Sequence, residues 1–119
     1  MSQAQLNAWR QIQRIKFKKI RDFHINLPVR NVQVDTDSSR EDIKGAIEAF
    51  DLLAVDGKVE WTMADNSVDY LTLDQLKAIR EEYIVRKGRA FRNFNAAVQA
   101  TLDTDDPEQV LAIDFSPGA

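Results

Sequence analysis

The sequence predicts an α+β fold in which a small β-hairpin and short strands pack against a basic N-terminal helix, a middle helix and a long C-terminal helix. Two patterns support this fold class. Apolar residues recur at helical spacing through residues 2–24 and 72–102, and apolar and polar residues alternate over residues 59–63. The hairpin is expected to link the middle helix to the long one.

The length of the chain, 119 residues, suits one domain with one modest core. The sequence shows no internal repeat, low-complexity segment or interdomain linker. We therefore expect residues 1–28 to form a basic amphipathic helix and residues 29–115 a compact α+β domain continuous with it. Residues 116–119 are expected to form a short tail.

The first helix is expected over residues 2–24, with apolar residues on one face and lysines and arginines on the other. It should end at Leu27-Pro28, because a residue that precedes proline is pushed out of the helical conformation. Residues 29–35 alternate in polarity and predict a short strand or an extended connector. The apolar face comprises Leu6, Trp9, Ile12, Phe17, Ile20 and Phe23, and Ile15 widens it.

The middle helix is expected to begin at Ser38 and to run to about Leu53. Ser38 with Glu41 three residues later has the pattern of a capping box, and Asp37 precedes it in the same turn-forming segment. The hairpin follows, with strands over residues 59–63 and 68–71. Asp65 and Asn66, followed by serine, predict the tight turn between these strands.

The long helix is expected to begin after Thr72, which forms a second capping box with Gln75. Gly88 lies within it and costs up to about 1 kcal/mol relative to alanine. A short last helix should begin at Asp106-Pro107, with aspartate as cap and proline at the first helical position. The apolar face of the long helix comprises Leu76, Ile79, Tyr83, Phe91, Phe94, Val98 and Leu102.

Charge is distributed unevenly along the chain. Residues 1–30 carry seven lysines and arginines and one aspartate, a net charge of +6, whereas the whole chain has a net charge of −3. The last nineteen residues contain no lysine or arginine. This asymmetry indicates either a basic arm for a polyanion or mutual attraction of the two ends, within one chain or between copies.

The composition offers little for catalysis. The absence of cysteine excludes disulfides, thiolate metal sites and thiol nucleophiles. There is no glycine-rich phosphate loop, and His24, the single histidine, has no partners at ligand spacing. The carboxylates around Asp37 and those of residues 103–106 are explained by helix capping better than by a cation site. We therefore expect no enzyme activity and no cofactor.

Membrane insertion is not expected either. No run of about 18 apolar residues is present, and the N-terminus lacks the apolar stretch of a secretory signal. A soluble product of cytoplasmic synthesis is the expectation.

Several residues are candidates for an interaction surface. The basic run within residues 16–21 is typical of helices that bind nucleic acid or anionic membranes, but the pI of about 5.1 favours a solvated face or one that meets the acidic remainder. Nucleic-acid binding is therefore not expected. Trp61 alternates with Val59 and Met63, so a place in the core is preferred to ligand stacking. The candidate surface comprises Trp9, Lys16, Lys18, Lys19, Arg21, Phe91 and Phe94.

The order of several segments carries a resemblance to a known family. These are Arg21-Asp22, residues 34–40, 43–47 and 61–67, Leu71-Thr72 before the long helix, residues 98–102, and Pro107-Glu108-Gln109-Val110-Leu111-Ala112-Ile113-Asp114. Over residues 14–115 the chain resembles a domain of unknown function common in tailed bacteriophages, in or beside tail-fibre and tail-fibre-assembly proteins. The most specific piece is Trp61-Thr62-Met63-Ala64-Asp65-Asn66. The resemblance implies no catalytic residue.

The resemblance implies a tail-associated structural protein of the tail-fibre or baseplate region, which docks on a tail or tail-fibre protein. The protein is expected in the virion tail, and in the host cytoplasm during assembly. It is expected to form a homo-oligomer within a larger assembly. The alternative is a tail-fibre assembly chaperone that is not retained in the virion. A weaker third hypothesis is a polyanion-binding module that uses the basic helix.

Overall fold

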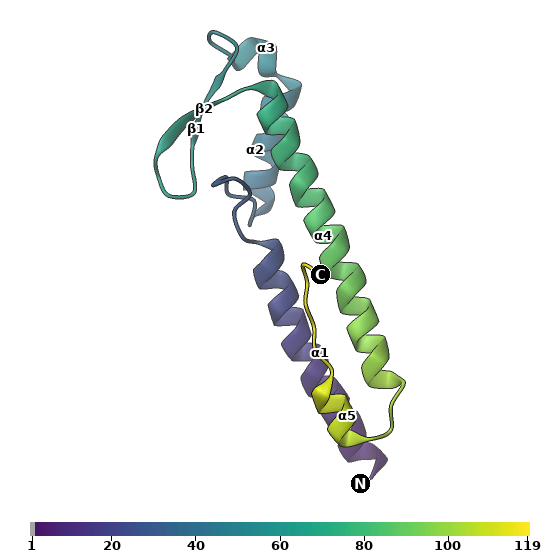
Figure 1. Cartoon of the computed structure of the whole chain (residues 1–119). Coiled ribbons are helices and arrows are strands. Elements are labelled where there is room, and N and C mark those ends of the chain that lie inside the picture. Colours follow the sequence, from purple (N-terminus) through teal and green to yellow (C-terminus); the bar gives the residue numbers. More distant parts are fainter. Residues whose placement is uncertain (1) are drawn as a thin grey trace. The chain divides into compact units, whose positions relative to one another are not determined.

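The computed structural model describes residues 2–119 and has an α+β fold (Figure 1). Its contacts group the chain into two compact units. Unit 1 contains the residues up to Ile25 together with Arg86–Ala119, and unit 2 contains Asn26–Val85. Residues 86–115, which the sequence assigned to the compact domain, thus group with the N-terminal helix.

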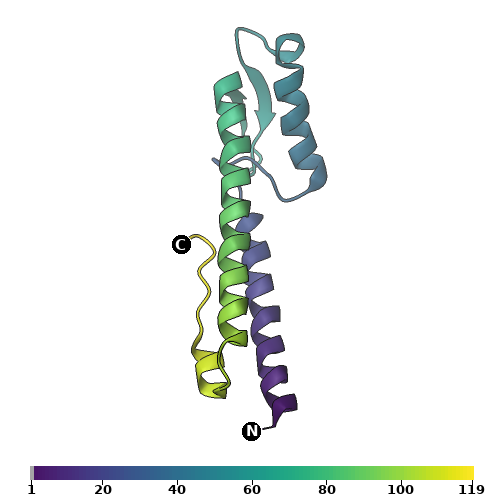
Figure 2. The ribbon, with the colours of Figure 1, turned by 90° about the vertical axis from the view of Figure 1, so that its right-hand side faces the viewer.

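Unit 1 is built from helix α1 (Gln3–Ile25), the C-terminal part of helix α4 (Leu73–Leu102) and the short helix α5 (Pro107–Ala112). In this unit α1 runs beside α4, and α5 with the following tail folds back along α1 (Figures 1 and 2). The predicted start of α5 is confirmed, because the Asp106 carboxylate accepts a hydrogen bond from the Glu108 N–H at 3.0 Å.

The core of unit 1 brings together three aromatic rings from three segments. Phe17 of α1, Phe94 of α4 and Phe115 of the tail pack with ring centroids 5.5 Å (Phe17–Phe115) and 6.1 Å (Phe94–Phe115) apart. The Asn93 side chain holds the same tail by donating to the Ala119 carbonyl at 2.9 Å. The other members of this core are Ala97, Val98 and Ile113.

Polar side chains of α1 satisfy carbonyls at the ends of two other helices. The last carbonyls of a helix have no partner within it. At the end of α4, Arg10 Nε donates to the Thr101 carbonyl at 2.9 Å and Nη2 to the Thr104 carbonyl at 2.8 Å. The buried Gln13 Nε2 donates to the Val110 carbonyl of α5 at 3.0 Å. These bonds explain why α1 buries polar residues.

The buried face of α1 therefore differs from the apolar face that the sequence predicted. Leu6 and Phe17 are buried as expected, but Ile12 and Phe23 are 52% and 72% exposed. Only part of the predicted apolar face therefore packs in the core. The positions that pack inward are Leu6, Gln13, Phe17, Arg21 and Ile25.

Unit 2 contains helices α2 (Asp37–Glu48) and α3 (Phe50–Leu53), strands β1 (Val59–Thr62) and β2 (Val68–Leu71), and the N-terminal part of α4. The strands form the predicted antiparallel hairpin, in which Val59 pairs with Leu71 and Thr62 with Val68. The core of the unit comprises Val29, Val32, Val34, Ile43, Ala46, Met63, Leu71, Leu76 and Ile79.

Residues 29–35 form no regular strand: Val29–Val32 make a tight turn, and residues 33–35 are an irregular connector, in line with the second of the two predicted alternatives. Val29 and Val32 exchange backbone hydrogen bonds of 2.9 and 2.8 Å. Arg30 and Asn31 between them have φ values of 49° and 63°, which is the left-handed conformation of a two-residue hairpin turn. The alternation of polarity arises because Val29, Val32 and Val34 all enter the core.

The middle helix begins before the predicted cap and ends earlier than predicted. Thr36 is the cap, and its hydroxyl accepts from the Ser39 N–H at 3.0 Å. Ser38 lies within the first turn instead, so its assignment as the cap was wrong. Helix α2 ends at Glu48, and Ala49 separates it from α3.

Replacement of Thr36 with alanine should lower the free energy of unfolding by about 1 kcal/mol, because one N–H of the first turn of α2 loses its acceptor. The matched change Ser38→Ala should alter it by less than about 0.5 kcal/mol. Urea denaturation followed by circular dichroism measures both. A larger loss for Ser38→Ala would show that the cap is at Ser38.

Candidate functional site

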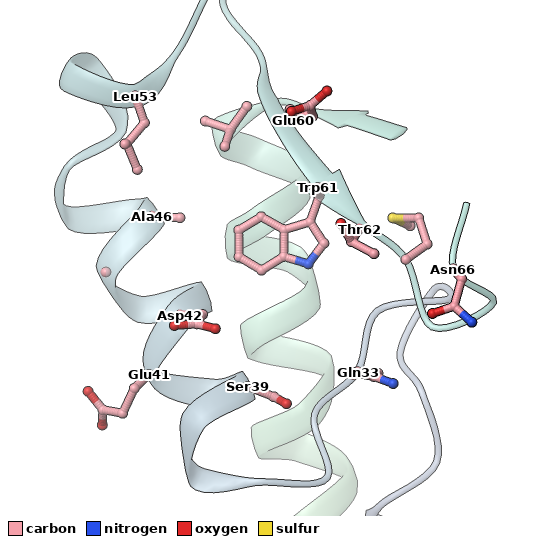
Figure 3. A pocket seen from close by; sticks show the side chains of 13 residues that line it. Gln33, Ser39, Glu41, Asp42, Ala46, Leu53, Glu60, Trp61, Thr62 and Asn66 are labelled. Carbon is pink, nitrogen blue, oxygen red and sulfur yellow. The ribbon is translucent and has the colours of Figure 1, made fainter. Parts of the chain in front are cut away.

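A cleft of about 700 Å³ lies in unit 2 between α2 and the hairpin (Figure 3). Helix α2 forms one wall and β1 the other, and Trp61 lies between them. The lining residues are Gln33, Ser39, Glu41, Asp42, Gly45, Ala46, Leu53, Val59, Glu60, Trp61, Thr62, Met63 and Asn66.

The alternation of β1 places Trp61 at this position. Side chains of a strand point to opposite faces in turn, so Val59, Trp61 and Met63 share a face. Val59 and Met63 are buried, whereas Trp61 is half-buried and packs against the edge of the core. The prediction of a core position is thus correct for one side of the indole, and the other side lines the cleft.

The polar groups of the cleft suit a ligand that carries positive charge and an apolar side chain. Glu41 and Asp42 on α2 and Glu60 on β1 are exposed carboxylates, and no lysine or arginine is among the lining residues described. Within residues 2–119 the Trp61 indole N–H has no hydrogen-bond acceptor, so it is available to a carbonyl of a bound peptide.

The turn that closes the hairpin is held by side-chain hydrogen bonds. Asp65 Oδ1 accepts from the Ser67 N–H at 2.9 Å and from the Ser67 hydroxyl at 2.5 Å. These bonds and one from the Asn31 side chain lower the pKa of Asp65, because they stabilise the ionised carboxylate. Asn66 has a φ of 68°, a conformation that asparagine tolerates well. The Ala64 N–H donates to the Asn31 carbonyl at 2.7 Å, which ties this turn to the one before α2.

The start of α4 is fixed by the predicted capping box. The Thr72 N–H donates to Gln75 Oε1 at 2.8 Å, and the Gln75 N–H donates to Thr72 Oγ1 at 3.2 Å. Asp37 occupies the first position of α2, where its charge favours the helix N-terminus, and it forms an ion pair with Arg40. Asp65, Asn66 and Thr72 thus have the structural roles that the sequence predicted, whereas Asp37 lies in the first turn of α2 and is not its cap.

A family model described as "Domain of unknown function (DUF4376)" matches residues 2–116, nearly the whole chain. The protein belongs to this family. No curated protein and no solved structure matches the chain. The match includes the cleft of unit 2 and the whole of α1 and α4, so both units of this DUF4376 domain are part of the family's pattern.

The predicted interaction surface of the DUF4376 domain is divided between exposed and buried positions. Lys16, Lys18 and Lys19 are exposed and Trp9 is half-buried. Arg21, however, is only 8% exposed, so its prediction as part of a docking surface was wrong.

Arg21 belongs to the interior of unit 1. Its guanidinium carbon lies 4.2 Å from the ring centre of Phe91 and 4.5 Å from that of Phe94, and it forms an ion pair with Asp22 at 2.9 Å. Phe94 is buried, and Phe91 is 37% exposed with one face covered by Arg21. A buried cation between two aromatic faces is a structural contact, so Phe94 is not available for docking.

The remaining sites that the sequence singled out carry no further chemistry. His24 is half-buried, and burial and the nearby Arg86 lower its pKa. Among residues 2–119, no three histidine, aspartate or glutamate side chains converge on a point that would hold a metal ion. None of the helices described is long and apolar enough to cross a membrane.

The sequence alone did not predict that Glu41, Asp42 and Glu60 form an acidic rim of the cleft. Asp42 and Glu60 are eighteen positions apart in the chain, and each is explained locally by a helix or a strand. The only available signal was Glu60 beside Trp61, and it does not show which face of α2 lies opposite.

Substitution Phe94→Ala should lower the free energy of unfolding by about 3 kcal/mol, because it opens a cavity in the unit 1 core. Phe91→Ala should cost roughly 1 kcal/mol, since part of the ring is already in solvent and mainly the contact with Arg21 is lost. Chemical denaturation of the two variants compares them. Equal losses would contradict the different burial of the two rings.

Proposed function

We propose that the protein is a tail-associated structural protein of a tailed bacteriophage, which docks on a tail or tail-fibre protein and catalyses no reaction. The single observation that carries the proposal concerns the Trp61–Asn66 segment. This segment carries the most specific part of the resemblance to tail-fibre-associated domains, and three of its side chains besides Trp61 line the open cleft of unit 2. The proposed location is the virion tail, after assembly in the host cytoplasm.

The proposed contact places an apolar side chain of the partner against Trp61. Half-buried tryptophans in a hollow are typical anchors of protein interfaces, where a few residues supply most of the affinity. Basic residues that flank the anchor would meet Glu41, Asp42 and Glu60 at the rim. Charge at the rim mainly sets the association rate and the choice of partner. Several copies of the chain would be held in the tail through this contact.

The alternative is a tail-fibre assembly chaperone, and it uses the same cleft. Such a protein would bind the fibre during assembly and leave before the virion is complete. Quantitative mass spectrometry of purified, salt-washed particles distinguishes the two roles. A fixed ratio to a tail component supports the structural protein, whereas absence from particles with abundance in the infected-cell lysate supports the chaperone. Absence of any association with fibre or tail proteins in both samples would overturn both.

Substitution Trp61→Ala should reduce incorporation into particles, or binding to the fibre protein, by about thirtyfold, which corresponds to the loss of about 2 kcal/mol expected of an interface anchor. Because Trp61 also contacts the core, the double variant Glu41→Gln, Asp42→Asn tests the rim without a packing change. Its matched control is Glu48→Gln, Asp51→Asn, which neutralises two exposed carboxylates outside the cleft. Equal effects of the two double variants would argue against docking in the cleft.

A further inference from the structure

A groove in unit 1 runs between α1 and the C-terminal part of α4. It consists of two adjoining hollows of about 420 and 230 Å³, which share Gln11 and Arg14 as lining residues. On α1 the lining residues Asn7, Gln11, Arg14 and Lys18 recur at spacings of four, three and four. This is the spacing with which one helix contacts another in a bundle.

Part of the lining of the groove is apolar. Ile15 of α1 and Leu102 of α4 are 47% and 53% exposed, and Val98 of α4 is half-buried. Phe94, a member of the unit 1 core, also lines one of the two hollows. A helix laid in this groove would therefore bury an apolar stripe of its own.

The walls of the groove carry free positive charge. Arg14 and Lys18 are exposed, and neither forms an ion pair within residues 2–119. No aspartate or glutamate lines either hollow in this part of the chain. The other two cations of the lining are already bound, Arg10 by backbone carbonyls at the end of α4 and Arg21 by Asp22 and two aromatic rings.

The net charge of unit 1 also favours an acidic partner. Unit 1 contains ten lysines and arginines against six aspartates and glutamates, a net charge of +4, and unit 2 contains six against thirteen, a net charge of −7. Four of the ten cations of unit 1 come from residues 86–92 of α4 and were not part of the predicted basic helix. A positive unit attracts an acidic partner and raises its association rate.

We propose that the groove binds an acidic amphipathic α-helix of a partner protein. The apolar stripe of that helix packs on Ile15, Val98 and Leu102, and its carboxylates pair with Arg14 and Lys18. Binding of an amphipathic helix in a groove with heptad-spaced walls is an established mode of peptide recognition. The proposal concerns a different unit from the Trp61 cleft and stands whether or not the protein belongs to a phage tail.

Two other occupants fit the groove less well. Binding of a nucleic acid depends on several phosphate-binding cations, and this groove offers two free ones beside apolar residues. A second copy of the chain would have to supply an acidic helix, but α2 already buries its apolar residues Ile43 and Ala46 in its own core. Two identical basic grooves would also repel each other.

The test uses the full chain and two fluorescent designed helices, each about three heptads long. Both carry leucine at positions a and d, and they carry either glutamate or lysine at positions e and g. Fluorescence anisotropy should show binding of the glutamate helix that weakens as salt is added, and no binding of the lysine helix. Hydrogen exchange should show protection of residues 11–18 and 94–102 by the glutamate helix.

Arg14→Glu with Lys18→Glu should weaken binding of the glutamate helix at least about tenfold and should create binding of the lysine helix. The matched control is Lys16→Glu with Lys19→Glu, which makes the same charge change on exposed α1 positions outside the groove and should change affinity by less than about twofold. Circular dichroism checks that both variants retain their helices. Equal weakening by the two variants, protection elsewhere in the chain, or no binding at low salt would overturn the proposal. Tighter binding of a DNA duplex would favour the nucleic acid instead.

Discussion

The packing of α4 is the constraint on which the rest of the structure depends, because this one helix supplies side chains to both cores. Leu76 and Ile79 belong to the core of unit 2, and Phe94 and Ala97 to that of unit 1. A helix gains most of its stability from such packing and little from propensity alone. The Trp61 cleft and the basic groove are built on the two cores that α4 completes.

The cations of unit 1 fall into two groups with different consequences. Arg10 and Arg21 are turned inward, where they satisfy carbonyls at the end of α4 and fill the space between two aromatic rings. Arginine suits such places because its planar guanidinium donates several hydrogen bonds and stacks on rings. Arg14 and Lys18 remain in solvent. The number of basic residues in the sequence of a helix is therefore larger than the number that a partner can contact.

Local patterns were reliable where neighbouring residues decide the structure. The hairpin, its Asp65-Asn66 turn and the caps at Thr72 and Asp106 were all predicted, because each depends on hydrogen bonds within a few positions. The prediction failed at Ser38, because Thr36 offers an equivalent hydroxyl two residues earlier. Choosing between the two requires the path by which residues 29–35 enter the helix, and this path depends on burial of three valines in the unit 2 core.

The sequence by itself determined the α+β class, the order of the elements, the turns and most caps, because these follow from periodicity and short-range hydrogen bonds. Only the tertiary structure decided which face of α1 is buried, since the carbonyls at the ends of α4 and α5 draw Arg10 and Gln13 inward and leave Ile12 and Phe23 in solvent. The tertiary structure also placed Asp42 and Trp61 together in the lining of the cleft, and Arg14 and Val98 together in the lining of the groove. Such sites join residues from distant segments, and their chemistry exists only once the long-range packing has formed.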